Sequence, residues 1–173
     1  MLKRLLEWDK QLVLDCLEKR QWRFWLTSAR TISRSGDGWM QVLFPLFICL
    51  LSPALGYELV ILVACGFLIE RPFYWLLKNS LRRKRPYDAI PDFQRIITAS
   101  DHFSFPSGHT AAAFLLATLS VAVLGISALP LVIWAIAVGC SRVMLGVHFP
   151  TDIVAGAILG SGIAVGILQY INI

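Results

Sequence analysis

Long apolar runs alternate with short polar stretches through most of the chain after residue 38. The runs predict helices over about 39–55, 57–77, 107–125, 129–147 and 151–170. Each is close to the ~20 apolar residues that a helix needs to cross the hydrocarbon core of a bilayer. The pattern therefore predicts an all-α fold, a multi-pass transmembrane bundle of about five spans.

Residues 1–30 follow a different pattern, in which leucines mix with lysine and arginine and with aromatic residues such as Trp8 and Trp25. This is typical of an amphipathic helix that lies on the membrane, and we interpret it as an anchor without a catalytic role. We expect a single membrane domain, 1–173, made of an interfacial helix and turn (1–38) and a catalytic bundle (39–173). Charges throughout 1–30 leave no apolar stretch of the kind found in a cleavable signal peptide.

Composition agrees with a membrane protein. The chain is 57% hydrophobic and 16% charged, with a net charge of +5 and a mean hydropathy of +0.66. All lysines and arginines fall in 1–34, 71–95 or at position 142, so that one membrane face carries nearly all the cations. Such a face favours anionic lipid headgroups or phosphate esters as partners. Nucleic acid is a poor alternative, because the basic clusters flank membrane spans.

The stretch 141–152 carries the candidate chemistry. His148 and Asp152 are four residues apart, so that on a helical turn they would share a face. A carboxylate there can accept one imidazole N–H and leave the other nitrogen free as a nucleophile. The Arg142 guanidinium fits phosphate oxygens. Together these residues point to phosphoryl transfer.

Two further stretches offer groups for an anion. The polar loop that follows the second run begins with Lys78 and reaches Arg85-Pro86 after six intervening residues. Residues Ser107, Gly108 and His109 mark the start of the next helix, where free backbone N–H groups favour an anion. If the chain crosses the membrane five times, all these groups lie on one face.

Small residues indicate how the spans come together. His109, Ala113 and Ala117 form one stripe, and Asp152, Gly156 and Gly160 form another. Small residues let membrane helices approach closely. We therefore predict that the helices over 107–125 and 151–170 pack along these stripes and bring His109 towards His148 and Asp152.

The three stretches together resemble the signature motifs of the type 2 phosphatidic acid phosphatase superfamily. Lys78 with Arg85-Pro86 is similar to its first motif, and Pro106-Ser107-Gly108-His109 to its second. Ser141-Arg142, His148 and Asp152 resemble its third. All motif positions are present in order.

The resemblance implies a role for each motif residue. His148 would attack phosphorus and form a phosphohistidine, Asp152 would orient it, and His109 would protonate the leaving group and then activate water. The phosphoryl oxygens would be held by five residues: Lys78, Arg85, Ser107, Gly108 and Arg142. No metal and no cofactor is expected, since the acidic residues and the three histidines are not clustered as metal ligands.

Other polar residues in the apolar or basic stretches receive structural interpretations. For Glu70 and Arg71 a structural ion pair with neighbouring helices is favoured over a substrate contact. The basic run 82–84 is expected to face headgroups, and His102 to lie in a surface loop, with a lid contact as its alternative. The four cysteines show no C-x-x-C spacing and are expected to be packing thiols: Cys16, Cys49, Cys65 and Cys140.

The leading hypothesis is an integral-membrane lipid phosphatase whose substrate is a lipid phosphate or pyrophosphate in the bilayer. Undecaprenyl pyrophosphate, phosphatidylglycerol phosphate, phosphatidic acid and lipid A phosphate all remain open, as does the oligomeric state. The alternatives are a lipid phosphotransferase, a vanadium haloperoxidase and a non-enzymatic binding or transport protein.

The sidedness of the site is predicted with two arguments in conflict. The distribution of lysine and arginine favours a cytoplasmic active face. The resemblance to the superfamily implies the opposite, because its members typically work on the extracytoplasmic or lumenal face. In addition, many of these cations are expected to be catalytic or interfacial, which weakens the argument from charge. We therefore expect a bacterial inner-membrane protein with an extracytoplasmic active site.

Overall fold

The computed structural model describes residues 2–18, 23–91, 93, 96–99 and 101–170. Within these residues the regular secondary structure is entirely helical, which confirms the predicted all-α class. The elements are α1 (Leu2–Glu18), α2 (Arg23–Ser35), α3 (Trp39–Leu51), α4 (Pro53–Leu81), α5 (Pro86–Ala89), α6 (Gly108–Leu124), the 3₁₀ helix η2 (Gly125–Ala128), α7 (Leu129–Met144) and α8 (Pro150–Tyr170).

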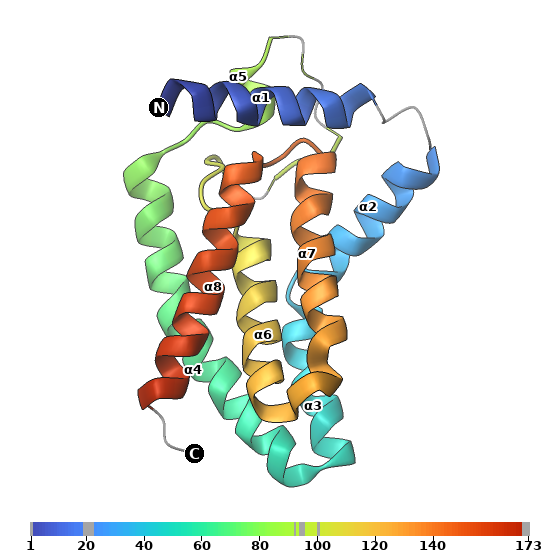
Figure 1. Cartoon of the computed structure of the whole chain (residues 1–173), viewed down its shortest axis with the longest axis vertical. Coiled ribbons are helices and arrows are strands. Elements are labelled where there is room, and N and C mark those ends of the chain that lie inside the picture. Colours follow the sequence, from blue (N-terminus) through green and yellow to red (C-terminus); the bar gives the residue numbers. More distant parts are fainter. Residues whose placement is uncertain (1, 19–22, 92, 94–95, 100, 171–173) are drawn as a thin grey trace.

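Helix α6 lies at the centre of the bundle, with α3, α4, α7 and α8 around it (Figure 1). One side of α6 packs Leu115 and Leu119 against Leu59 and Leu62 of α4. Its other side packs alanines against α7. A helix that is apolar all round is expected to be buried in this way, since each face needs an apolar partner.

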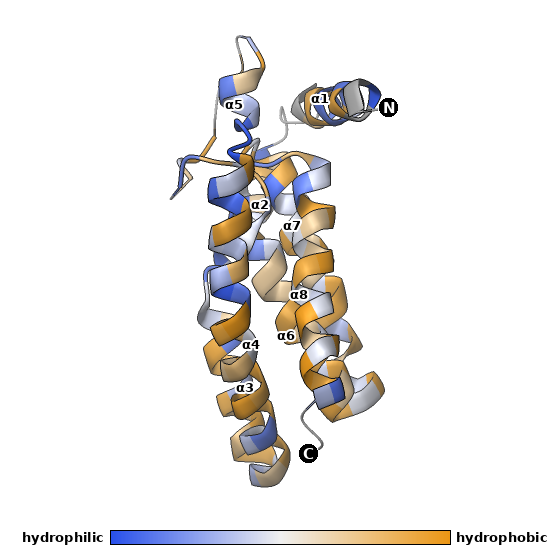
Figure 2. Ribbon diagram, turned by 90° about the vertical axis from the view of Figure 1, so that its left-hand side faces the viewer, coloured by the Kyte–Doolittle hydropathy of each residue, from blue (hydrophilic) through white to orange (hydrophobic). Residues whose placement is uncertain are grey.

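Three stretches are long and apolar enough to cross a membrane: Pro53–Ala89, Gly108–Met144 and Pro150–Tyr170. The second contains α6 and α7, which run antiparallel on either side of η2 (Figure 1). The first expected span, over about 39–55, corresponds to α3, which is apolar but shorter. These helices are hydrophobic over most of their length (Figure 2). Large apolar side chains such as Leu50 and Leu68 are exposed, as expected for surfaces that contact lipid.

Helices α6 and α8 are in close contact along the glycines of α8, as predicted. A Cβ on Gly156 would lie 2.5 Å from the Ser107 carbonyl oxygen, and one on Gly160 would lie 2.1 Å from that of Ala111. The prediction chose the wrong stripe of α6, however. Ala113 and Ala117 pack in the core with α7, because α6 is rotated so that the neighbouring stripe faces α8.

The amphipathic N-terminal segment is helical and forms two helices that run in different directions. Helix α1 lies across one end of the bundle, and α2 runs down alongside α7 (Figure 1). Trp8, Phe24 and Trp25 are exposed, as expected for aromatic side chains at a membrane surface. Trp22, another aromatic residue of the predicted amphipathic segment, lies outside the described residues.

Candidate active site

The candidate nucleophile lies in the short connection between α7 and α8. His148 is buried, and its Nδ1 lies 3.5 Å from Oδ2 of Asp152. The two residues meet because Asp152 sits in the first turn of α8, which begins only at Pro150, so they do not share a helical turn as expected. Asp152 Oδ2 also accepts a 2.8 Å hydrogen bond from the Phe149 backbone N–H.

Burial determines the protonation of His148. Loss of solvent lowers the pKa of His148 to about 4, even though the Asp152 carboxylate acts in the opposite direction. The imidazole is therefore neutral at physiological pH. With Nδ1–H directed at Asp152, the lone pair of Nε2 is available to attack an electrophile.

Two of the expected phosphate-binding cations already hold a carboxylate. Lys78 Nζ lies 2.6 Å from Oδ2 of Asp101, and the Arg85 guanidinium pairs with Oδ1 of the same residue. Tyr74 donates a 2.6 Å hydrogen bond to Asp101 as well. Although burial alone would raise it, the pKa of Asp101 is held well below its usual range by the hydrogen bonds from Lys78 and Tyr74 and by the charge of Arg85.

The third cation comes from the C-terminal turn of α7. Arg142 is buried, and its Nη1 donates a 2.6 Å hydrogen bond to Ser33 Oγ of α2. Its Nε has no hydrogen-bond partner among the described residues. Helix α2 thus helps to position a group of the site, which the sequence did not suggest.

The start of α6 brings three predicted residues to the site in different ways. Ser107 caps the helix: its Oγ accepts a hydrogen bond from the Thr110 hydroxyl at 2.9 Å, and its N–H donates to the Asp152 carbonyl at 3.0 Å. Gly108 lies against Tyr74, whose ring would be 2.9 Å from an added Cβ. His109 places Nε2 2.6 Å from Asp37 Oδ1, in the turn after α2.

These groups surround one pocket of about 740 Å³. Six of the eight predicted site residues line it: Lys78, Arg85, Gly108, His109, Arg142 and His148. Ser107 and Asp152 lie behind them, fully buried. The pocket is large enough for a small organic ligand, and much larger than a phosphate group alone requires.

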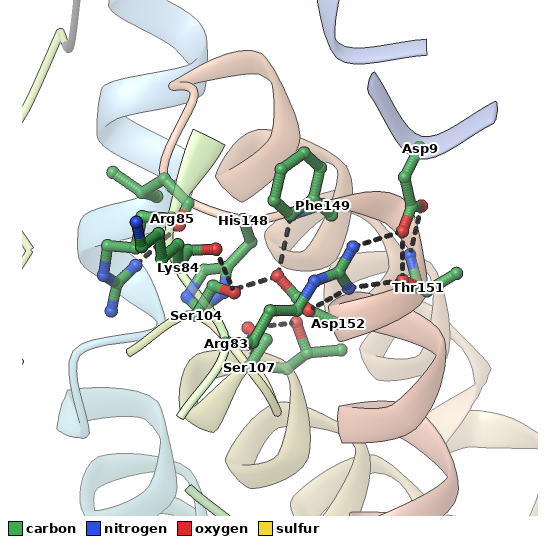
Figure 3. A network of polar contacts seen from close by, with 12 residues as sticks. Asp9, Arg83, Lys84, Arg85, Ser104, Ser107, His148, Phe149, Thr151 and Asp152 are labelled. Atoms are coloured by element: carbon green, nitrogen blue, oxygen red, sulfur yellow. Dashed lines mark hydrogen bonds and ion pairs between the residues drawn. The ribbon is translucent and has the colours of Figure 1, made fainter. Parts of the chain in front are cut away.

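The basic run 82–84 requires one correction. Arg82 and Lys84 are exposed, as expected. Arg83 instead turns inward and donates a 2.6 Å hydrogen bond to Asp152 Oδ1 (Figure 3). Its other nitrogen, Nη2, lies 2.6 Å from Asp9 Oδ2 of α1, so α1 contacts the residue that pairs with Asp152.

The sequence analysis did not predict the acidic partners of the site: Asp9, Asp37 and Asp101. Each is a single carboxylate in a helix or loop without a recurrent pattern. Their partners are far away in sequence, such as His109 for Asp37. The one feature that could have predicted these carboxylates is the general need of buried or pocket-lining cations for a counter-charge.

Glu70 and Arg71 differ from the prediction, whereas His102 agrees with it. Arg71 pairs with its neighbour Glu70, rather than with another helix, and also lines the pocket. His102 is exposed in its loop. Cys49, Cys65 and Cys140 are free thiols in apolar helices.

Comparisons with known proteins identify a family and several similar proteins. The model of the PAP2 superfamily matches residues 45–173. A decaprenylphosphoryl-5-phosphoribose phosphatase of Mycolicibacterium smegmatis is 34% identical over 134 residues, which cover 76% of this chain and 71% of that protein. A lipid A 4'-phosphatase of Bacteroides thetaiotaomicron is 36% identical over 88 residues, which cover 49% of this chain and 39% of that protein.

Two solved structures share the fold. LpxE of Aquifex aeolicus superposes with a TM-score of 0.74 at 24% identity and covers 93% of both chains. A PAP2-type phosphatidylglycerolphosphate phosphatase of Bacillus subtilis gives a TM-score of 0.74 at 23% identity and covers 96% of this chain and 86% of its own. The superfamily model spans every predicted motif residue, from Lys78 to Asp152. The chain therefore belongs to the PAP2 superfamily and is a membrane phosphatase that hydrolyses phosphate esters.

Proposed function

We propose that this lipid phosphatase works through a phosphohistidine on His148, without a metal ion. The observation that carries the proposal is the pairing of neutral, buried His148 with Asp152 at 3.5 Å, in a pocket also lined by His109 and by six lysine and arginine residues, among them Lys78, Arg85 and Arg142. Among the described residues, groups of three or more His, Cys, Asp or Glu side chains that could hold a metal are absent. Positioning and charge stabilisation suffice for phosphoryl transfer when enough cations surround the phosphoryl oxygens.

In the first step the Nε2 lone pair of His148 forms a bond to phosphorus as the bond to the leaving oxygen breaks. Lys78, Arg85 and Arg142 attract the phosphoryl oxygens, and Gly108, which lines the pocket at the start of α6, offers its backbone N–H to the phosphate. Ser107 acts from behind, because its hydroxyl is engaged by Thr110. His109, whose Nε2 lies 2.6 Å from Asp37 Oδ1, donates a proton to the leaving oxygen.

In the second step water attacks the phosphohistidine, and inorganic phosphate leaves. His109, now neutral, accepts a proton from the water. Asp152 stabilises the positive charge of the His148 ring while phosphorus is attached and remains ionised throughout. Over the two steps one phosphoester bond is broken and one water molecule is consumed, and the products are the dephosphorylated lipid and inorganic phosphate.

The substrate we propose is a phosphate monoester or pyrophosphate of a membrane lipid. The pocket is lined by residues of α2, of polar loops and of the apolar helices α4, α6 and α7, so the phosphate of a lipid reaches His148 while its chains stay in the bilayer. Relatives that act on decaprenylphosphoryl-5-phosphoribose and on lipid A support this class. Undecaprenyl pyrophosphate, phosphatidylglycerol phosphate and phosphatidic acid belong in the same substrate panel. We place the enzyme in a bacterial inner membrane with its site on the extracytoplasmic face.

The test measures phosphate release from this panel by detergent-solubilised protein in the presence of a chelator. We expect the native protein to release phosphate and to form a labelled, acid-labile phosphoenzyme. His148→Ala should do neither. His102→Ala, in an exposed loop, serves as the histidine control and should retain activity. Hydrolysis that survives in His148→Ala, or that requires an added divalent cation, would contradict the mechanism.

A further inference from the structure

Arg83 joins two carboxylates that come from opposite ends of the chain (Figure 3). Its Nη1 lies 2.6 Å from Asp152 Oδ1, and its Nη2 lies 2.6 Å from Asp9 Oδ2. The Arg83 side chain is only 18% exposed, and both carboxylates are buried. Charge-assisted hydrogen bonds of this length between largely buried groups are strong and directional.

Because Arg83 binds one oxygen of Asp152, the two carboxylate oxygens have different partners. Oδ1 accepts from Arg83, while Oδ2 accepts from the Phe149 N–H at 2.8 Å and faces His148. A carboxylate held at both oxygens cannot rotate, so the direction from Oδ2 to His148 is set. Because the distance to His148 Nδ1 is 3.5 Å, the outer limit of a hydrogen bond, a small rotation of Asp152 decides whether that bond can form.

Arg83 is itself held by groups that include the N-terminal helix. Its guanidinium lies over the Phe149 ring, 4.2 Å from the centroid, and donates to Thr151 Oγ1 at 2.6 Å. Asp9 of α1 completes this arrangement: it pairs with Arg83 and accepts the Thr151 backbone N–H at 3.1 Å. On the same face of α1, Val13 is also fully buried, so α1 is packed onto the bundle at this point.

We propose that Arg83 is a positioning residue for the His148–Asp152 pair, and that α1, through Asp9, is a necessary part of the active site. The proposal rests on the proposed phosphohistidine mechanism. Arg83 acts through Asp152 and does not contact the phosphate. Helix α1, whose exposed side carries Trp8 and Leu12, then couples the seating of the protein at the membrane surface to the alignment of its nucleophile.

The first experiment replaces Arg83 and follows the rate of phosphoenzyme formation with labelled lipid phosphate. We expect Arg83→Gln to lower kcat and this rate by about 100-fold, the size of effect that misplacing a reacting group produces, with KM changed less than about threefold. Arg83→Lys should recover part of the loss, because it keeps a charge near Asp152. Arg82→Gln, in the same loop but exposed, is the matched control and should behave like the native protein.

The second experiment tests the link to α1. Asp9→Asn should lower kcat by about tenfold, and the Asp9→Asn/Arg83→Gln double variant should be no slower than Arg83→Gln alone, since Asp9 acts through Arg83. Glu7→Gln, an exposed residue of α1, should leave kcat unchanged. The melting temperature of each variant in detergent separates loss of alignment from loss of folded protein.

The outcomes separate this proposal from the mechanism on which it rests. If the native protein forms no phosphohistidine, the mechanism fails first. If it does, and folded Arg83→Gln forms it at the native rate, the positioning role is wrong. Additive losses in the double variant, or a rise in KM alone for Arg83→Gln, would likewise overturn it, since they would assign Asp9 or Arg83 to another task.

Discussion

At the scale of single residues, the most consequential contact is the one between Asp101 and the cations expected to bind phosphate. Lys78 and Arg85 are both paired with this carboxylate, which also takes hydrogen bonds from Tyr74 and Lys78. A phosphate that reaches the two cations therefore meets a negative charge already in place. Asp101 should oppose phosphate binding, while the loop that carries it keeps the cations in position.

We expect Asp101→Asn to bind inorganic phosphate more tightly as a competitive inhibitor, on the order of tenfold, because removing a like charge a few ångströms away is worth about 1.4 kcal/mol or more. The measurement is the inhibition constant of phosphate in the phosphatase assay. Asp88→Asn, exposed in α5, is the control for a general change of charge. Weaker inhibition in Asp101→Asn would show that the carboxylate orients the cations more than it competes with the substrate.

A second expectation at this scale concerns pH. The pKa of His148 is lowered by burial from 6.5 to about 4, so the folded protein binds this proton less readily than the unfolded chain. Stability from this group is thus present above pH 6.5 and is lost as the pH falls towards 4. The nucleophile should remain neutral over the same window, and the acid limb of kcat/KM should lie near pH 4. An acid limb near pH 6.5 would contradict the burial argument.

At the scale of elements, the contact between α6 and α8 aligns the two halves of the site. Helix α6 carries His109 and α8 carries Asp152, and the Ser107 N–H donates to the Asp152 carbonyl at 3.0 Å. The glycines of α8 make this approach possible, since a Cβ on Gly160 would lie 2.1 Å from a backbone oxygen of α6. Backbone atoms cannot move aside as a flexible side chain can.

Gly160→Ala should therefore destabilise the protein by about 1–3 kcal/mol, the usual cost of overpacking, and reduce kcat as the helices separate. Gly162→Ala on the same helix is the matched control, because nothing lies within 4 Å of its Cβ, and alanine favours a helix over glycine by up to ~1 kcal/mol. Thermal unfolding in detergent and phosphatase assays compare the two variants. Equal melting temperatures would show that the helices do not depend on this close approach.

At the scale of the whole molecule, the site residues come from loops and helix ends on the side of the bundle where α1 and α5 lie (Figure 1). Helices α1 and α5 lie at this end, while η2, which joins α6 to α7, lies towards the other (Figure 1). The orientation of the bundle in the membrane therefore determines which leaflet supplies the substrate. The positive-inside rule would place this end in the cytoplasm, but Lys78, Arg83 and Arg85 are engaged with carboxylates of the site and are weak indicators of topology.

We expect the active end to face the outside. In a background without native cysteines, Ser80→Cys should react with a membrane-impermeant maleimide in intact cells, because Ser80 is exposed at the active end of α4. Ser127→Cys, exposed in η2 at the opposite end, should react only after permeabilisation. The reverse pattern of labelling would place the site in the cytoplasm.

The sequence by itself determined the class of fold and the groups that carry the chemistry. Apolar runs of membrane-spanning length must form helices in lipid, because unpaired backbone groups are too costly there. The spacing of Lys78 and Arg85, of Ser107 and His109, and of Arg142, His148 and Asp152 marked the site, since these residue types within three short stretches suit a phosphate and its transfer.

Only the tertiary structure decided how those groups are held. Its decisive contacts join residues far apart in the chain, such as Arg83 with Asp9 and Asp152, and Arg142 with Ser33. It also chose which stripe of α6 faces α8. A local pattern records whether a residue is apolar, charged or small, but the partner of a buried charge depends on helix rotation and loop path, which packing of the whole bundle sets.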